Sequence, residues 1–154
     1  MTIRVRAMQL SDIDSVFAIE IAAHQAPWTR DILRDCVALH YDCHVIEIDN
    51  ASEVKLAGYI ICRSHENSCH VLNLCIATAL QGKGYGQYLL KNRLDALQAT
   101  PIDSVTLEVR RSNLSAMHLY QKLGFEKVRI KRGYYRDGQS IEDAIVLKKN
   151  VVKI

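Results

Sequence analysis

Long apolar runs are missing from this chain of 154 residues. No stretch approaches the roughly 18 apolar residues that a membrane-spanning helix needs, and residues 1–6 lack the apolar core of a secretory signal. The net charge of +3 is compatible with an anionic ligand but is too small to indicate nucleic-acid binding. We therefore expect a cytoplasmic protein without a membrane partner and without direct contact with nucleic acid.

Prolines are also scarce, and internal repeats, linkers and low-complexity tracts are absent from the sequence. The only two prolines, Pro27 and Pro101, both fall between predicted elements. Hydrophobic residues make up 49% of the chain and charged residues 24%, which is ordinary for a globular protein. The length suits one hydrophobic core, so we expect a single domain over residues 1–154. A monomer is favoured, although no sequence feature sets the oligomeric state.

Cysteine spacing gives no sign of a disulfide framework. The chain has five cysteines, an odd number without regular spacing, so reduced thiols are expected. Cys36, His40, Cys43 and His44 offer four soft metal ligands close together, but they lack a CxxC knuckle and run from a predicted helix into a predicted strand. Ordinary packing is therefore favoured over a zinc site, and no metal is predicted.

Apolar periodicity and turn residues predict the order β-α-α-β-β-β-α-β-α-β-β. The expected strands are residues 3–7, 44–48, 56–62, 69–76, 104–110, 126–130 and 141–148, and the expected helices are residues 12–23, 30–39, 84–99 and 113–123. Ser11, Thr29 and Ser112 are the predicted N-caps, and Gly124 is the residue that follows the last helix. The mixture predicts an α+β fold, in which a mostly antiparallel sheet of about seven strands carries about four helices on both faces.

A glycine-rich loop, residues 81–87, separates a predicted strand from a predicted helix. Gly82, Gly84 and Gly86 alternate in it, so its backbone N–H groups could surround a phosphate at the start of the helix. The loop lacks the GxxxxGK pattern of a nucleoside-triphosphate loop and the GxGxxG pattern of a dinucleotide-binding fold. From the loop alone, a tight strand-to-helix turn without a ligand stays open as the alternative.

Motifs on both sides of this loop decide between a phosphate-binding loop and a tight turn without a ligand. Gln81-x-x-Gly84-x-Gly86 follows the apolar run LNLCI at residues 72–76, and the downstream segment contains LEVR at residues 107–110, Asn113, and LYQKLGFE at residues 119–126. In this order and spacing, the motifs resemble the GNAT superfamily of acetyl-CoA-dependent N-acetyltransferases over most of the chain. The resemblance implies the GNAT acyl-CoA N-acyltransferase fold, with acetyl-CoA as the acetyl donor.

A closer resemblance rests on AHQAPWT at residues 23–29, on the LEVR motif, on Tyr134-Tyr135, and on EDA at residues 142–144. These segments are similar to the RimI family of ribosomal-protein-alanine N-acetyltransferases. The resemblance implies direct transfer, in a ternary complex, to the N-terminal alanine of a small-subunit ribosomal protein. Two alternatives stay open: a GNAT enzyme that acetylates lysine or a small-molecule amine, and a GNAT-fold module that binds CoA without turnover.

The predicted catalytic residues are Glu108 and Tyr120. The ammonium form of an α-amine, with a pKa of about 7.7–8.0, cannot attack a thioester, so a base is needed. Periodicity places Glu108 on the non-core face of its strand and by itself favours a solvated carboxylate. The resemblance implies instead that Glu108 is the general base, acting directly or through water. Tyr120 lies in an apolar helical stripe and could be a packed tyrosine, whereas the resemblance implies a general acid for the CoA sulfur.

The resemblance also assigns the contacts to the acetyl donor. The implied cofactor-binding residues are Leu74, Cys75 and Ile76 for the acetyl and pantetheine groups, Gly82, Lys83, Gly84, Tyr85, Gly86 and Gln87 for the pyrophosphate, and Asn113 for the pantetheine arm. A backbone N–H near Ile76 could stabilise the oxyanion that develops on the acetyl group. Cys75 is interpreted as a small strand residue rather than a nucleophile, because no base is near it in the sequence.

Recognition of the acceptor has fewer signals. Trp28, Tyr134 and Tyr135 are the predicted substrate-binding residues, and packed aromatic side chains are the alternative. Glu142 and Asp143 could hold the ammonium group, although charged residues at the start of a strand are more often solvated. Four histidines carry no functional signal, namely His24, His65, His70 and His118.

Overall fold

Seven strands and four α-helices follow one another in the predicted order within residues 1–138 and 140–154, the part of the chain that the computed structural model describes. The strands are β1 (Thr2–Ala7), β2 (Asp42–Asp49), β3 (Val54–His65), β4 (Ser68–Ile76), β5 (Ser104–Arg110), β6 (Glu126–Asp137) and β7 (Ser140–Asn150). The helices are α1 (Ile13–Ala23), α2 (Arg30–Ala38), α3 (Tyr85–Ala96) and α4 (Leu114–Lys122), with short 3-10 turns η1 (Leu10–Asp12), η2 (Thr78–Leu80) and η3 (Leu97–Ala99).

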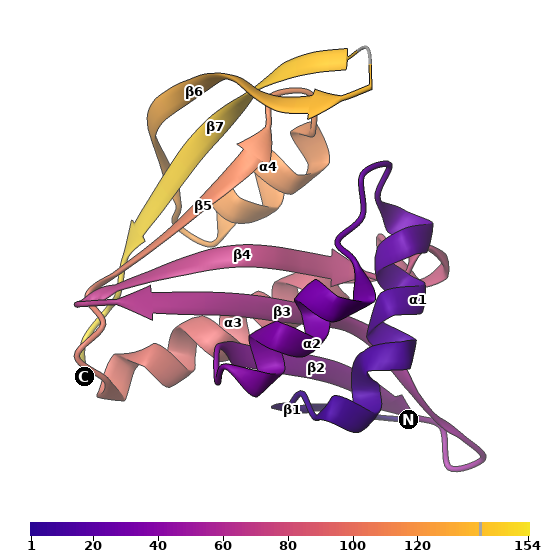
Figure 1. Ribbon diagram of the computed structural model, residues 1–154. Coiled ribbons are helices and arrows are strands. Elements are labelled where there is room, and N and C mark those ends of the chain that lie inside the picture. The colour runs from indigo at the N-terminus through magenta and orange to yellow at the C-terminus, as the bar shows by residue number, and fades with distance from the viewer. Residues whose placement is uncertain (139) are drawn as a thin grey trace. The chain divides into compact units, whose positions relative to one another are not determined.

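The strands form one mixed sheet in the order β1-β2-β3-β4-β5-β7-β6 (Figure 1). The pairs β1–β2, β2–β3, β5–β7 and β6–β7 are antiparallel. The pair β4–β5 is parallel, and it joins residues 68–70 to residues 104–106. The predicted fold class, a mixed and mostly antiparallel sheet in an α+β fold, is confirmed.

Two compact units make up the chain. The first unit contains residues Met1–Arg63 and Leu72–Arg93, and the second unit contains residues Ser64–Val71 and Leu94–Ile154. Strand β4 therefore contributes its beginning to the second unit and its end to the first. None of the helices in the described residues is long and apolar enough to cross a membrane.

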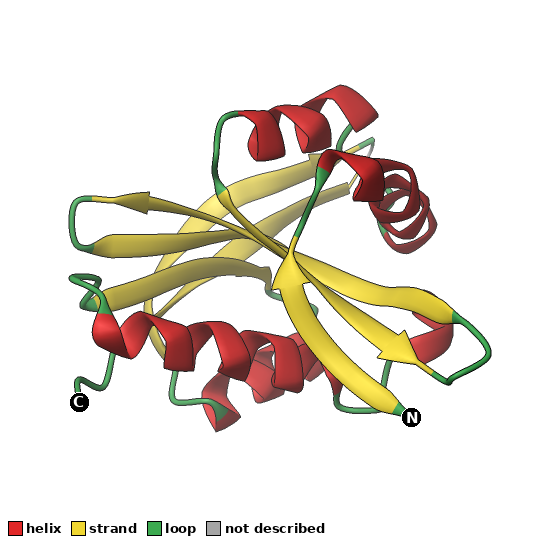
Figure 2. Ribbon diagram, turned by 90° about the horizontal axis from the view of Figure 1, so that it is seen from below, coloured by secondary structure: helices red, strands yellow, loops and turns green. Residues whose placement is uncertain are grey.

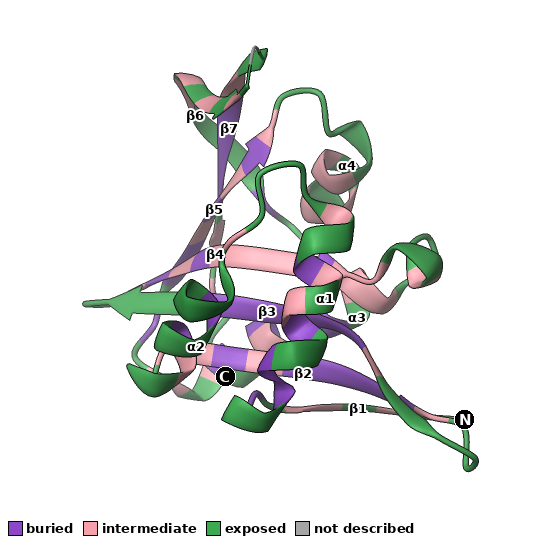
Figure 3. Cartoon of the chain, turned by 45° about the vertical axis from the view of Figure 1, so that its right-hand side comes forward, coloured by how far each residue is buried: buried purple, intermediate pink, exposed green. Residues whose placement is uncertain are grey.

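The core of the first unit lies between its helices and the strands β2 and β3. Figure 2 shows α1 and α2 on one face of these strands and α3 on the other, and much of β2 and β3 is buried (Figure 3). Burial of apolar side chains is the main stabilising contribution here, at about 25 cal/mol per Å² of apolar surface. The buried cluster consists of Met8, Ile13, Val16, Leu33, Cys36, Cys43, Val45, Tyr59, Ile61 and Cys75.

The helix starts in the first unit agree only in part with the predicted caps. Thr29 caps α2 as predicted, because its hydroxyl accepts the N–H of Ile32 at 3.2 Å. The prediction for Ser11 is wrong: this residue lies inside η1, and Asp12 precedes α1. The Asp12 carboxylate accepts the N–H of Gln9 at 2.7 Å, so it satisfies a backbone donor at the start of η1.

In the second unit, β5 shows the predicted alternation. Val105, Leu107 and Val109 are buried, and the residues between them are partly exposed. Helix α4 begins one residue later than predicted, because Asn113 rather than Ser112 is its N-cap: the Asn113 side chain accepts the N–H of Ala116 at 3.2 Å.

Gly124 ends α4 as predicted, with a positive φ of 96°. The Gly124 N–H donates to the Gln121 carbonyl at 3.0 Å, and the Phe125 N–H donates to the Tyr120 carbonyl at 3.0 Å. These two bonds are the Schellman pattern, which satisfies carbonyl groups of the last helical turn.

Strand β6 is longer than the predicted residues 126–130, because it continues to Asp137 and includes the tyrosine pair. Its register with β7 is irregular: Lys131 pairs with Ala144, whereas Tyr135 pairs with Glu142. The extra residues form a bulge that contains Gly133 at a positive φ of 60°. A bulge interrupts the two-residue alternation, which explains why the pattern missed the second half of the strand.

Candidate active site

The predicted site residues are divided between the two units. The first unit contains Trp28, the end of β4 and the glycine loop. The second unit contains the two predicted catalytic residues, Asn113 and the tyrosine pair of β6.

The glycine loop has a backbone conformation that only glycine adopts without strain. Gly82 and Gly84 have φ values of 77° and 87°, in the left-handed region. A Cβ atom at either position would meet no atom within 4 Å, so packing does not exclude a side chain. The residues from Gln81 to Gly84 are exposed, and α3 begins immediately after them. The turn needs its glycines, and it leaves accessible backbone at a helix N-terminus, which fits a phosphate-binding loop.

The end of β4 is held close to β3 by a glycine that the sequence analysis did not single out. A Cβ atom on Gly58 would overlap the carbonyl oxygen of Cys75 and would lie 2.5 Å from Cδ1 of Ile76. The Ala77 N–H donates to the Ala57 carbonyl at 2.8 Å. The Gln81 side chain also donates to the Ile76 carbonyl at 3.0 Å, so the first residue of the loop is tied to the strand that precedes it.

The cysteines are packed as small buried side chains. All five side chains are buried. Burial raises the pKa of the Cys75 thiol to about 11 and that of Cys43 to about 12, which keeps both protonated at neutral pH. Cys36 and Cys43 belong to the core of the first unit. Within residues 1–138 and 140–154, no three His, Cys, Asp or Glu side chains are arranged to hold a metal ion.

A buried carboxylate, Glu20 on α1, is a feature that the sequence analysis missed. Its side chain is 2% exposed. One carboxylate oxygen accepts the backbone N–H of Trp28 at 2.9 Å, and the other accepts the Asn73 amide at 3.0 Å and the Tyr59 hydroxyl. His24 lies 3.4 Å from the same carboxylate. Glu20 therefore ties the segment that carries Trp28 to strands β3 and β4.

The Trp28 side chain is partly buried and packs against the core of the first unit. The packed alternative therefore describes this residue correctly, and its contact with an acceptor remains a prediction.

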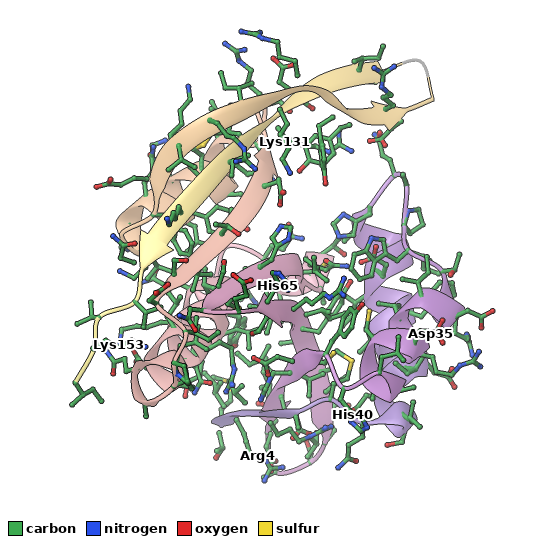
Figure 4. All side chains as sticks on the ribbon, turned by 60° about the vertical axis from the view of Figure 1, so that its left-hand side comes forward. Arg4, Asp35, His40, His65, Lys131 and Lys153 are labelled. Carbon is green, nitrogen blue, oxygen red and sulfur yellow. The ribbon has the colours of Figure 1, made fainter. Side chains whose placement is uncertain are left out.

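In the second unit, the Glu108 carboxylate is enclosed by two basic side chains. Its Oε1 lies 2.7 Å from Nζ of Lys131, and its Oε2 lies 2.5 Å from Nε2 of His70. The Glu108 side chain is 11% exposed, so it is not the solvated group that periodicity alone favoured. The hydrogen bond with His70 is the main cause of a Glu108 pKa lowered to about 2, and Lys131 adds to it. Lys131 is labelled in Figure 4, where it extends from β6.

His70 is a site residue that the sequence did not reveal. It pairs with Thr106 in the parallel ladder between β4 and β5, and Thr106 lies two residues before Glu108. Residues two apart on a strand share a face, so this register brings the imidazole to the carboxylate. A single histidine in an apolar strand carries no local signal for such a contact.

Tyr120 lies on α4 and is partly exposed. Its ring contacts Phe125 edge-on, with 5.9 Å between the ring centroids. Burial raises the pKa of the Tyr120 hydroxyl to about 12, so the phenol is protonated at neutral pH and can donate a hydrogen bond or a proton. A packed ring and a proton-donating hydroxyl are thus compatible.

The tyrosine pair on β6 lies next to the same cluster. The rings of Tyr134 and Tyr135 meet edge-on with centroids 5.1 Å apart, and Nζ of Lys131 lies 5.0 Å from the Tyr134 ring centroid. Burial is the main cause that raises the pKa of Tyr135 to about 12; the negative charge of Glu108 adds to it, and the positive charge of Arg110 opposes it. The second unit therefore places Glu108 and both predicted acceptor tyrosines around one cluster.

The carboxylates of Glu142 and Asp143 accept hydrogen bonds from backbone N–H groups of the chain itself. Glu142 accepts the N–H of Ser112 at 2.6 Å, and Asp143 accepts the N–H of Gly133 at 2.9 Å. A side-chain hydrogen bond with Ser112 is the main cause of the lowered pKa of Glu142, and the Ser112 N–H adds to it. For Asp143, the hydrogen bond from the Gly133 N–H is the main cause of the lowered pKa. The alternative that they hold the acceptor ammonium group gains no support, because both stabilise the β6 bulge and the start of α4. Asn113 is exposed at that helix start.

Comparisons with known proteins agree with the motif analysis. A family model described as acetyltransferase (GNAT) family matches residues 9–125. The ribosomal protein bS18-alanine N-acetyltransferase of Haemophilus ducreyi is 34% identical over 138 residues, which cover 88% of this chain and 92% of the relative.

Solved structures give the same result. The crystal structure of the ribosomal-protein-S18-alanine N-acetyltransferase from Escherichia coli matches with a TM-score of 0.90 at 25% identity, covering 99% of this chain and 96% of that one. Arabidopsis thaliana NAA60 in complex with acetyl-CoA matches with a TM-score of 0.84 at 17% identity over 97% of this chain and 99% of that one, a likeness of fold alone.

Proposed function

We propose that this chain, which belongs to the acetyltransferase (GNAT) family, moves acetyl from acetyl-CoA to the N-terminal α-amine of a protein. It has the GNAT fold and is an acetyl-CoA-dependent N-acetyltransferase. The assignment of the acceptor rests on one observation. Over most of both chains, the sequence is 34% identical to a relative named for the alanine of ribosomal protein bS18. The proposed acceptor is therefore the N-terminal alanine of this small-subunit ribosomal protein.

The donor is proposed to bind along the end of β4 and the glycine loop. The backbone of residues 74–76 would contact the acetyl and pantetheine groups, residues 82–87 would hold the pyrophosphate, and Asn113 would bond the pantetheine arm. The positive φ values and the open surroundings of Gly82 and Gly84 support this assignment, because backbone N–H groups there can approach a phosphate without hindrance from side chains.

Chemistry is proposed to proceed by direct transfer in a ternary complex. The α-ammonium group must lose a proton before its nitrogen can attack the thioester, and Glu108 is proposed to drive this step. Tyr120 is proposed to protonate the departing sulfur, and the raised pKa of its hydroxyl supports that role because the phenol keeps its proton at neutral pH. Trp28, Tyr134 and Tyr135 are proposed to line the acceptor site.

The setting of the reaction follows from the acceptor. A ribosomal protein substrate would place the enzyme in the cytoplasm, as a single domain and a monomer, without a membrane or nucleic-acid partner of its own. These are proposals that rest on the relative's acceptor and on the composition of the chain.

A peptide panel tests the acceptor. Purified protein is incubated with acetyl-CoA and three classes of acceptor: peptides with a free N-terminal alanine or serine, N-terminally blocked peptides that contain lysine, and small amines. Mass spectrometry then locates the acetyl group. We expect modification at the α-amine of alanine-starting peptides. Acetylation of lysine or small amines alone would favour the first alternative function, and CoA binding without turnover of any amine would favour the non-catalytic one.

Two variants test the assigned chemistry. Glu108→Gln and Tyr120→Phe should each lower kcat by ~10²–10⁴-fold, the usual contribution of acid–base catalysis, while acetyl-CoA binding stays close to that of the wild type. Glu126→Gln and Tyr88→Phe, at exposed positions outside the assigned site, are the matched controls. Unchanged turnover in both test variants would contradict the assignment.

A further inference from the structure

Asn73 lies on β4 directly before the segment that is proposed to contact the acetyl group, and its side chain has a fixed orientation. Its amide nitrogen, Nδ2, donates to Oε1 of Glu20 at 3.0 Å. A carboxylate only accepts hydrogen bonds, so the nitrogen end of the amide must face Glu20. The oxygen end, Oδ1, is therefore turned away from the carboxylate.

The Oδ1 atom of Asn73 is available to a ligand. No group within residues 1–138 and 140–154 donates a hydrogen bond to it, and Asn73 is partly exposed. Because Nδ2 donates to a charged group, the amide is polarised, and Oδ1 becomes a stronger acceptor than the oxygen of an isolated amide. The side chain thus offers one oriented and uncharged hydrogen-bond acceptor.

The surroundings of Asn73 place its amide oxygen close to both proposed binding segments of the first unit. The carboxylate that fixes Asn73 also accepts the backbone N–H of Trp28 at 2.9 Å, so the two residues share one anchor. Cys75 lies two residues after Asn73, on the same face of the strand, and belongs to the same buried cluster as Val16 of α1. Asn73 is thus on the face of β4 that is directed toward α1, next to the backbone proposed to hold the acetyl group.

An N-terminus differs from other amines in the group that adjoins the reacting nitrogen. In an N-terminus a peptide N–H lies close to the amine, whereas a lysine side chain has only methylene groups there. This N–H needs a hydrogen-bond acceptor when the substrate leaves water, because a donor without a partner is costly. An uncharged oxygen suits a peptide N–H, and it does not attract the ammonium group of a lysine as a carboxylate would.

We propose that Oδ1 of Asn73 accepts the first peptide N–H of the substrate protein, that is, the N–H of its second residue, and that Glu20 is the positioning residue behind it. This inference rests on the proposed function and deepens it, because it names a group that distinguishes an N-terminal α-amine from other amines. The roles proposed for Glu108 and Tyr120 are unchanged by it.

The test combines a substrate analogue with a variant. The analogue is an alanine-starting peptide in which an ester replaces the first peptide bond, so that the N–H is lost and the shape is kept. For the wild type, kcat/KM should be ~3–10-fold lower with the ester than with the peptide, the effect of one hydrogen bond. Asn73→Ala should lower kcat/KM for the peptide by the same factor and should use peptide and ester equally. This loss should appear mainly in KM, because the contact is present both before and during transfer.

Comparison of the two preferences removes other effects of the ester. The ester also changes the basicity of the neighbouring α-amine, but this change is the same for both enzymes and cancels in the double comparison. Asn50→Ala, at an exposed position between β2 and β3, is the matched control and should keep the wild-type preference. Glu20→Gln should weaken the preference, because a glutamine amide can present its oxygen or its nitrogen to Asn73 and no longer fixes which end faces it.

Different results would refute different statements. If the wild type acetylates the α-amine and uses peptide and ester equally, the inference is wrong and the proposed function stands. The same preference in the wild type and in Asn73→Ala would assign the N–H to another acceptor and would also overturn the inference. If the wild type modifies no α-amine, the proposed function fails and the inference falls with it.

Two measurements guard against misfolding of Asn73→Ala. The comparison of peptide and ester in the wild type needs no variant. Asn73→Ser keeps a hydroxyl that can donate to Glu20 but lacks the amide oxygen, so it should lose the preference for the peptide with less disturbance of the buried carboxylate. A serine variant that keeps the full preference would contradict the role of Oδ1.

Discussion

Replacing Glu20 by alanine tests the buried carboxylate of the first unit. The substitution removes the acceptor of three donors at once: the backbone N–H of Trp28 at 2.9 Å, the Asn73 amide at 3.0 Å and the Tyr59 hydroxyl. These donors come from three different parts of the chain, so one side chain connects the α1–α2 segment to β3 and β4. A carboxylate that is 2% exposed can be tolerated in a protein only when such partners compensate for its desolvation.

The expected loss of stability in Glu20→Ala is the balance of opposing contributions. Hydrogen bonds to a charged group contribute ~1.5–3 kcal/mol each, and a buried donor left without an acceptor costs ~1–3 kcal/mol. The desolvation penalty of the carboxylate disappears with it, which offsets part of the loss, and removal of one member of a buried charged network typically costs ~3–5 kcal/mol. For a chain of this size, 1 kcal/mol corresponds to ~2–4 °C in Tm. A loss of about 4 kcal/mol would therefore lower Tm by ~8–16 °C.

Urea and thermal unfolding followed by circular dichroism measure this loss. Glu20→Gln keeps the shape but has one acceptor oxygen in place of two, so its free energy of unfolding should lie between those of the wild type and Glu20→Ala. Glu53→Ala, at an exposed position in the same unit, is the matched control and should change stability by less than ~0.5 kcal/mol. A Glu20→Ala protein within ~1 kcal/mol of the wild type would show that the three donors find other acceptors, and it would refute the reasoning.

Two further predictions concern the glycine loop and the acid range. Gly84→Ala should lower the free energy of unfolding by ~1–2 kcal/mol, because φ is 87° at this position. Calorimetry should also show weaker acetyl-CoA binding, and unchanged binding would contradict the assignment of this loop to the donor. Because the pKa of Glu108 is lowered from 4.5 to about 2, its ionised form stabilises the folded state above pH 4.5, and this stabilisation is lost as the pH falls toward 2. The urea midpoints of wild type and Glu108→Gln should therefore converge between pH 5 and about 2, whereas a constant gap would contradict the ion pairing.

Local patterns in the sequence were sufficient for most of the fold. Strand β5 has the predicted bounds because its apolar residues alternate strictly and one face is buried. The turn at Gly124 and the cap at Thr29 were also predicted correctly, because each depends on the conformation or hydrogen bonding of a few adjacent residues. The second half of β6 was missed, because a bulge removes the alternation on which a strand prediction depends.

The same distinction holds for the candidate site. The glycine loop, Glu108 and Tyr120 lie in continuous motifs, so the sequence by itself determined the family, the donor and the order of the elements. Only the tertiary structure decided that His70 meets Glu108 and that Glu20 receives three donors, since these contacts join residues 38 and up to 53 positions apart. The physical reason is that a sequence motif reflects the conformation and hydrogen bonding of adjacent residues. The partner of a buried charge is set instead by strand register and packing, which no local pattern encodes.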